Sequence, residues 1–136
     1  MIGIYAIKNT LNNKYYIGES INIEERWENH KLQMGKNHHR NKKLKKDLLK
    51  YGINSFEFII IRDLDYLKTI QSSEVIENIL LIIESLYMNK YDSINNGYNK
   101  SNSLMAKLRR HPETAQELMN LYQKIYQNND EYSYKI

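Results

Sequence analysis

Residues 2–19 have the sequence IGIYAIKNTLNNKYYIGE. Apolar and aromatic side chains predict two strands, 2–8 and 14–19, and the asparagine-rich segment 9–13 between them predicts a turn. Because side chains alternate along a strand, an antiparallel pairing can place Tyr5 and Tyr16 on one face. The other face then receives Ile2, Ile4, Tyr15 and Ile17.

The pattern after residue 21 changes to that of a helix. Asn22 can cap this helix, with Glu25 three residues later in capping-box position. Apolar residues follow at helical spacing, and Gly35 ends the helix. Arg26 and His30 are four residues apart, so we expect them to be neighbours on its surface.

A second predicted helix, 40–51, carries most of the positive charge. We expect its buried side to consist of Leu44, Leu48 and Leu49. The net charge is +4, and one stretch holds a cluster of cationic side chains with Asp47 as the only acid: Lys31, Lys36, Arg40, Lys42, Lys43, Lys45, Lys46 and Lys50. Such a cluster attracts polyanions. By itself, a basic run is more often a solvated helix face.

The remaining elements are a third strand, 56–61, and a long apolar helix from residue 72 or 73 to about 91. Glu84 interrupts this helix beside its apolar stripe, and Asn99 follows the turn at 95–97. Two further helices are expected at 103–110 and 112–128, the second opened by Pro112. Its apolar residues either pack back on the domain or pair with another copy, and we favour packing.

The composition excludes several classes of protein. With 136 residues, 41% hydrophobic and 26% charged, the chain suits one compact domain. The absence of cysteine excludes disulfides and cysteine-ligated zinc. No targeting segment is visible, and the apolar run 79–83 is too short to span a membrane. We therefore expect an intracellular (cytoplasmic) protein with no membrane contact.

Three side chains have chemistry that suits phosphodiester hydrolysis, which requires an activated water and neutralised phosphate charge. The guanidinium of Arg26 matches two phosphate oxygens, and His30 can exchange a proton near neutral pH. A carboxylate such as Glu84 can bind a hard divalent cation. Taken separately, each has a plainer explanation as a solvated helix residue, and Tyr5 and Tyr16 as strand residues that pack.

The combination resembles the GIY-YIG nuclease family. The family pattern is matched by Gly3-Ile4-Tyr5, ten residues, then Tyr16-Ile17-Gly18. The later positions of that pattern are matched by Arg26, His30, Glu84 and Asn99. His39 matches a further histidine of homing-type members. Glu19 is a departure, because members often carry a small polar or amide residue there.

The resemblance covers about residues 1–100 and implies both a fold and a set of roles. The fold is α+β, with a small three-stranded antiparallel sheet flanked by helices (β-β-α-α-β-α) and followed by C-terminal helices. Tyr5 would be the general base or its relay, and Tyr16 would orient the phosphate or a metal-bound water. Arg26 and His30 would act on the phosphate, and Glu84 would hold the metal, Mg²⁺ or Mn²⁺. The site wall would be formed by Gly3, Gly18 and Asn99.

The expected function is therefore metal-dependent hydrolysis of DNA by an endonuclease. Residues 1–100 would form the nuclease domain and 101–136 a helical C-terminal extension. The expected DNA-binding residues are His39, Arg40, Lys42, Lys43, Lys45 and Lys46. We expect a free-standing enzyme from a phage, mobile element or defence system. A homodimer is one expected form of this enzyme. Two alternatives remain open: an inert basic nucleic-acid-binding module with the same fold, and a basic structural or RNA-associated protein.

Overall fold

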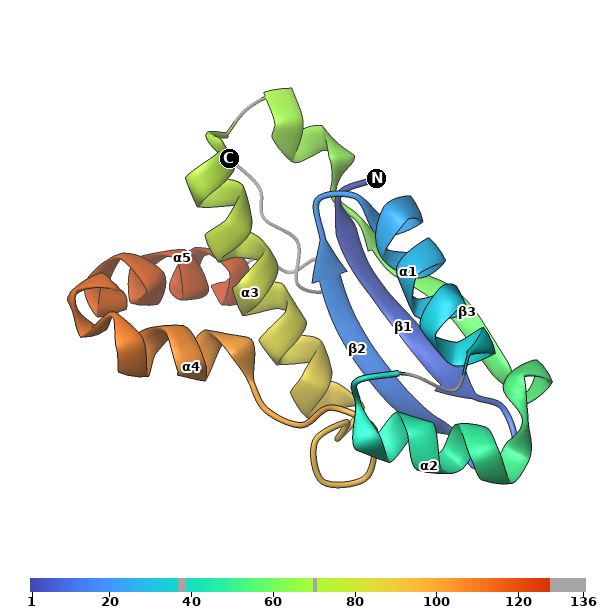
Figure 1. Ribbon diagram of the computed structural model, residues 1–136. Coiled ribbons are helices and arrows are strands. Elements are labelled where there is room, and N and C mark those ends of the chain that lie inside the picture. Colours follow the sequence, from blue (N-terminus) through green and yellow to red (C-terminus); the bar gives the residue numbers. More distant parts are fainter. Residues whose placement is uncertain (37–38, 70, 128–136) are drawn as a thin grey trace.

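The computed structural model of the protein describes residues 1–36, 39–69 and 71–127 (Figure 1). Three strands, β1 (Gly3–Asn9), β2 (Lys14–Ser20) and β3 (Phe56–Asp63), form one sheet. The strand order is β2-β1-β3, and both pairings are antiparallel. The first strand is therefore central and β2 is an edge strand. The predicted α+β fold with a three-stranded antiparallel sheet is confirmed.

Helices cover both faces of this sheet. One face carries Tyr5 and Ile7 and packs against α1 (Ile23–Gly35) and α2 (Lys42–Tyr51). The other face carries Ile4 and Ile17 and packs against α3 (Ser73–Lys90). The alternation predicted for residues 2–19 is therefore correct, and it separates the face of Tyr5 and Tyr16 from the face of Ile4, Tyr15 and Ile17.

Asparagine and serine side chains begin the main helices. Asn22, Asn41, Ser72 and Asn102 each accept a hydrogen bond from a backbone N–H in the first turn of their helix. The predicted cap at Asn22 is confirmed. The predicted burial of Leu49 is wrong, because its side chain is 63% exposed while Leu44 and Leu48 are buried. Leu44 and Leu48 are one turn apart, and the next residue points about 100° away.

The C-terminal helices α4 (Ser103–Arg110) and α5 (Ala115–Gln127) pack against α3 (Figure 1). Their buried residues, Leu104, Leu118, Leu121 and Ile125, belong to the same apolar cluster as those of α3. Pro112 opens a short 3-10 turn, Pro112–Thr114, and the α-helix starts only at Ala115. Residue 128, expected to end this helix, and the rest of the tail to 136 lie outside the described residues.

Two further 3-10 turns, Ile53–Ser55 and Asp65–Thr69, flank β3. In the part of the chain that the structure describes, no helix is both long and apolar enough to cross a lipid bilayer.

Candidate active site

Two glycines allow close approach of neighbouring groups on β1 and β2. Tyr5 is directly opposite Gly18 in the β1–β2 pairing. A Cβ at Gly18 would overlap the Cζ and hydroxyl oxygen of Tyr5. A Cβ at Gly3 would overlap the carbonyl oxygen of Arg62, next to the irregularity in the β1–β3 register. Any side chain at position 18 would therefore displace the hydroxyl end of Tyr5.

Tyr5 is completely buried and is hydrogen-bonded to a pair of histidines. Its hydroxyl oxygen lies 2.9 Å from His30 Nε2, and His30 Nδ1 lies 2.7 Å from His39 Nε2. The backbone N–H of Asn41 donates to His39 Nδ1 at 3.1 Å. Both histidines are buried, with 7% and 6% of their surface exposed. His39, expected on the DNA-binding surface, thus lies in the interior beside His30.

Tyr16 lies next to this group but is only partly buried. Its ring centre is 6.4 Å from that of Tyr5 and 5.4 Å from that of His30. Burial raises the pKa of both tyrosines above the usual range, and each is raised further by the charge of Glu84. Burial also lowers the pKa of His30 to about 4, assisted by His39 and by Arg26. The hydroxyls and the imidazole are therefore uncharged near neutral pH.

Arg26 lies on α1 and is exposed. It lines a hollow of about 390 Å³ together with residues from the end of β2, the following residue and α3, namely Glu19, Ser20, Ile21, Glu77 and Leu81. Its positive charge lowers the pKa of both Tyr5 and Tyr16, in opposition to burial. The guanidinium of Arg26 therefore lines a hollow and acts electrostatically on both tyrosines. Such a cation can bind an anionic oxygen, for example that of a phosphate.

Glu84 is deeply buried on α3, although the sequence pattern placed it only beside the apolar stripe. Its side chain is 5% exposed, and its Oε1 atom has no hydrogen-bond partner. Burial, and then the charge of Glu19, raises the pKa of Glu84 to about 8. Hydrogen bonding with the backbone of Glu19 and the side chain of Ser103 acts in the opposite direction. Such an unpartnered buried oxygen is unfavourable unless a ligand contacts it.

Asn99 closes the free edge of β2. Its side-chain oxygen accepts from the backbone N–H of Ile17 at 2.8 Å, and its Nδ2 donates to the carbonyl oxygen of Ile17 at 2.9 Å. Asn99 is buried. The amide therefore replaces a neighbouring strand at this edge. The Glu19 backbone, which hydrogen-bonds with Glu84, lies two residues further along β2.

The carboxylates fit a hard divalent cation. Among the described residues, no group of three or more His, Cys, Asp or Glu side chains is arranged to hold a metal. Magnesium does not require one, because it keeps several waters and is often bound through one or two carboxylates. Glu84 offers an unpartnered oxygen, and the charge of Glu19 acts on it directly. These two side chains could hold the ion.

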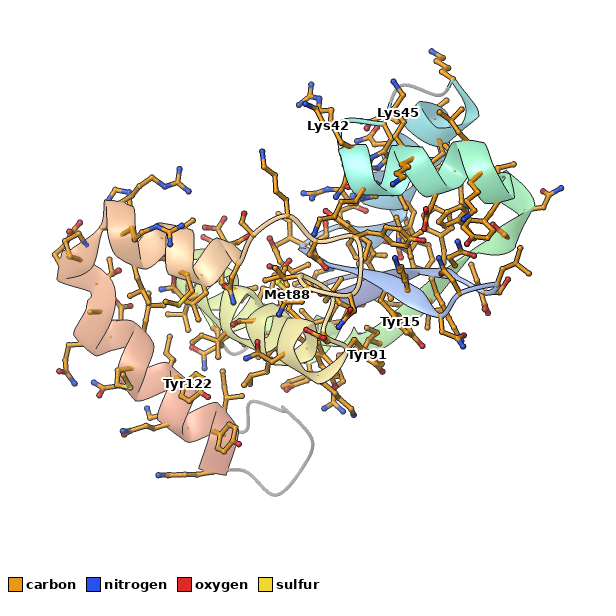
Figure 2. All side chains as sticks on the ribbon, turned by 90° about the horizontal axis from the view of Figure 1, so that it is seen from below. Tyr15, Lys42, Lys45, Met88, Tyr91 and Tyr122 are labelled. Carbon is orange, nitrogen blue, oxygen red and sulfur yellow. The ribbon has the colours of Figure 1, made fainter. Side chains whose placement is uncertain are left out.

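The predicted basic surface is present on and before α2, except for His39. Arg40, Lys42 and Lys46 are exposed and Lys45 is partly buried. Figure 2 shows Lys42 and Lys45 at the opposite end of the molecule from Tyr122 on α5. A hollow of about 330 Å³ is lined by Arg40, Asn41, Lys42, Lys43 and Lys100. This surface has the charge that a nucleic-acid backbone requires.

Lys43 differs from its neighbours on α2 because its Nζ binds the protein itself. It donates to the carbonyl oxygens of Ile94 and Asn99 at 2.7 and 2.8 Å. We therefore interpret Lys43 as a residue that fixes the segment carrying Asn99.

Two residues that support the site, Tyr98 and Asn41, are not predicted from the sequence. Tyr98 is buried, and its hydroxyl donates to Asp47 at 2.7 Å and accepts from Asn9 at 3.1 Å. Asn41 caps α2, donates from its side chain to the carbonyl oxygen of Tyr98, and donates from its backbone to His39. An asparagine directly before a helical pattern is a recognisable cap signal, but its contacts with distant residues have no local signature.

Comparison with known proteins gives consistent matches. Residues 1–99 match the family model described as the GIY-YIG catalytic domain. Intron-associated endonuclease 1 of Enterobacteria phage T4 is 38% identical over 97 residues, which are 71% of this chain and 36% of that protein. The chain thus matches little more than a third of the length of this relative.

Two solved structures share the fold. The catalytic domain of homing endonuclease I-TevI has a TM-score of 0.62 at 33% identity, covering 74% of this chain and 99% of that one. A mutant of the catalytic domain of intron endonuclease I-TevI has a TM-score of 0.60 at 34% identity, covering 74% and 94%.

Proposed function

Because the chain belongs to the GIY-YIG catalytic domain family, we propose that it is a magnesium-dependent endonuclease that hydrolyses phosphodiester bonds in DNA. One observation carries the proposal furthest. The charges of Glu84 on α3 and Arg26 on α1 both act on Tyr5 and Tyr16, which lie on two different strands. Four elements therefore contribute to one site that combines a cation, a metal-binding carboxylate and hydroxyl groups.

The side chains divide the chemistry between them. Arg26 is exposed and would bind the non-bridging oxygens of the scissile phosphate and neutralise their charge. Tyr16 is partly buried and would contact the attacking water or the phosphate. Tyr5 is fully buried and keeps its own hydrogen near neutral pH, so it would act on the attacking water only as a hydrogen-bonding relay through a neighbouring hydroxyl. His30 would hold the hydroxyl of Tyr5 in position through the hydrogen bond between them.

Glu84, assisted by Glu19, would hold the Mg²⁺ or Mn²⁺ ion. When bound, such an ion acts as a Lewis acid on the phosphate and lowers the pKa of water. The unpartnered Oε1 of Glu84 supports this assignment, because a cation would compensate an oxygen that otherwise lacks any partner.

DNA is the proposed substrate because the basic surface of α2 and residue 40 suits a phosphate backbone. The similarity to an intron-associated phage endonuclease supports an origin in a phage or mobile element. A single site cuts one strand at a time, so cutting a duplex would require two chains or two successive events. A homodimer on DNA is the simpler arrangement.

Supercoiled plasmid incubated with the protein and Mg²⁺ tests the proposal. We expect nicked or linear product from the wild type, and none from Glu84→Ala. The matched control is Glu74→Ala, because Glu74 is an exposed carboxylate on the same helix. Circular dichroism establishes that both variants fold. Plasmid binding without cleavage by the wild type would instead indicate an inert binding module, and equal activity of Glu84→Ala and wild type would refute the assigned site.

A further inference from the structure

A directed row of hydrogen bonds leads from the start of α2 to the tyrosine of β1. It consists of the Asn41 backbone N–H, the two rings of His39 and His30, and the Tyr5 hydroxyl. Both rings use both of their nitrogens in these bonds. The rings are nearly parallel, 8° apart, with centres 5.0 Å apart. Because the two nitrogens are only 2.7 Å apart, the rings meet edge to edge.

The first bond determines the direction of the others. A backbone N–H can only donate, so His39 Nδ1 carries a lone pair. A neutral imidazole has a single N–H, so the hydrogen of His39 is on Nε2 and is donated to His30 Nδ1. By the same rule, His30 carries its hydrogen on Nε2 and donates it to the oxygen of Tyr5.

Burial favours the neutral form of both imidazoles. Burial lowers the pKa of His30 to about 4, and burial also lowers the pKa of His39. Protonation of His39 at Nδ1 would in addition break its bond from the Asn41 N–H. The geometry and the desolvation therefore favour the same neutral tautomers.

The oxygen of Tyr5 therefore already accepts a hydrogen bond, and its own hydrogen must point away from His30. Tyr16 is the neighbouring hydroxyl-bearing residue: its ring centre is 6.4 Å from that of Tyr5, and Tyr5 lowers the pKa of Tyr16 against the effect of burial. The row thus leads from the protein backbone to the hydroxyl of Tyr5, next to the partly buried Tyr16.

We propose that His39 is a positioning residue: it holds His30 in the tautomer whose Nε2–H points at Tyr5, and so directs the Tyr5 proton towards Tyr16 and the site. The catalytic consequence rests on the proposed nuclease function, whereas the tautomers are a property of the folded protein. This role differs from the expected DNA contact, since His39 is only 6% exposed.

Nitrogen-15 NMR of the imidazole rings at pH 7 tests the tautomers without any assay of activity. The chain has four histidines, which single substitutions assign. We expect both His30 and His39 to be neutral with the hydrogen on Nε2. A hydrogen on Nδ1 of either ring would overturn the proposal, whether or not the protein cleaves DNA.

Two substitutions test the consequence for catalysis. In His39→Gln, the amide N–H can still donate to His30 Nδ1, so single-turnover cleavage should stay within about threefold of wild type. His39→Leu removes the donor and should lower the cleavage rate about 10- to 100-fold, with the Kd for DNA unchanged. Equal losses in both variants, or a loss confined to DNA affinity, would contradict the role. If His39→Leu does not fold, the proposal is still tested by the tautomers of the wild type and by the cleavage rate of His39→Gln.

Discussion

Tyr5 and Gly18 face each other across the β1–β2 pairing, and the hydroxyl end of the tyrosine occupies the space of a side chain at position 18. Gly18→Ala should therefore push the Tyr5 ring out of line with His30. We expect a loss of at least about 100-fold in cleavage rate, because small displacements of reacting groups have effects of that size. Overpacking should also lower the free energy of unfolding by about 1–3 kcal/mol. Cleavage assays and urea unfolding measure the two effects.

Gly35→Ala is the matched control for this substitution. Gly35 ends α1, and a Cβ there would contact nothing within 4 Å. Both the cleavage rate and the stability should stay at or slightly above the wild-type level. A Gly18→Ala enzyme as active as Gly35→Ala would show that the position of Tyr5 does not limit the reaction.

The buried carboxyl of Glu84 should make the metal-free protein less stable as the pH rises. Its pKa is raised from 4.5 to about 8, so the folded state binds this proton more tightly than the unfolded state does. The stabilisation is complete below pH 4.5 and is lost as the pH rises to about 8. A difference of this size corresponds to about 5 kcal/mol.

Urea unfolding in EDTA at pH 5 to 8 measures this effect. Relative to Glu84→Gln, which cannot ionise there, the wild type should lose stability across the range. Added Mg²⁺ should restore stability to the wild type at pH 8 but not to the variant. Parallel stability curves for the two proteins would show that Glu84 is already ionised or is well solvated in the fold.

The sequence predicted the elements of this fold well because their signals are local. The strands at residues 3–9 and 14–20 are rich in apolar and aromatic residues and flank an asparagine-rich turn, and Asn22 and Ser72 are recognisable caps. The error at Leu49 has the same origin: three leucines were assigned to one face although one of them lies a further 100° around α2.

Sequence patterns predict only part of the candidate site. Residue spacing indicated Tyr5, Arg26 and Glu84, but burial depends on contacts between distant segments. Glu84 is buried and hydrogen-bonds with the backbone of Glu19 on β2, and His39 is buried with its Nδ1 accepting from the backbone N–H of Asn41. Neither position has a local pattern that would predict it.

Glu19 should contribute to metal affinity, because its negative charge acts on Glu84 and both carboxyl groups have raised pKa values, mainly through burial. We expect Glu19→Gln to weaken Mn²⁺ binding about 10-fold in calorimetric titrations without DNA. Glu77→Gln is the control, since Glu77 lines the same hollow but is exposed. The Mn²⁺ affinity of Glu77→Gln should differ from that of the wild type by less than about twofold. Tighter binding by Glu19→Gln would mean that Glu19 does not take part in holding the ion.

Lys46 and Lys43 should separate DNA affinity from stability on the same helix. Lys46 is exposed, so Lys46→Ala should reduce the slope of log K against log salt concentration by about 1 and leave the unfolding free energy unchanged.

Lys43 donates to the carbonyl oxygens of Ile94 and Asn99, so Lys43→Ala should lower the unfolding free energy by about 1 kcal/mol. Because that loss loosens the segment carrying Asn99, it should also reduce cleavage more than binding. Fluorescence anisotropy at several salt concentrations and urea unfolding measure both variants, and identical effects of the two substitutions would rule out a distinct structural role for Lys43.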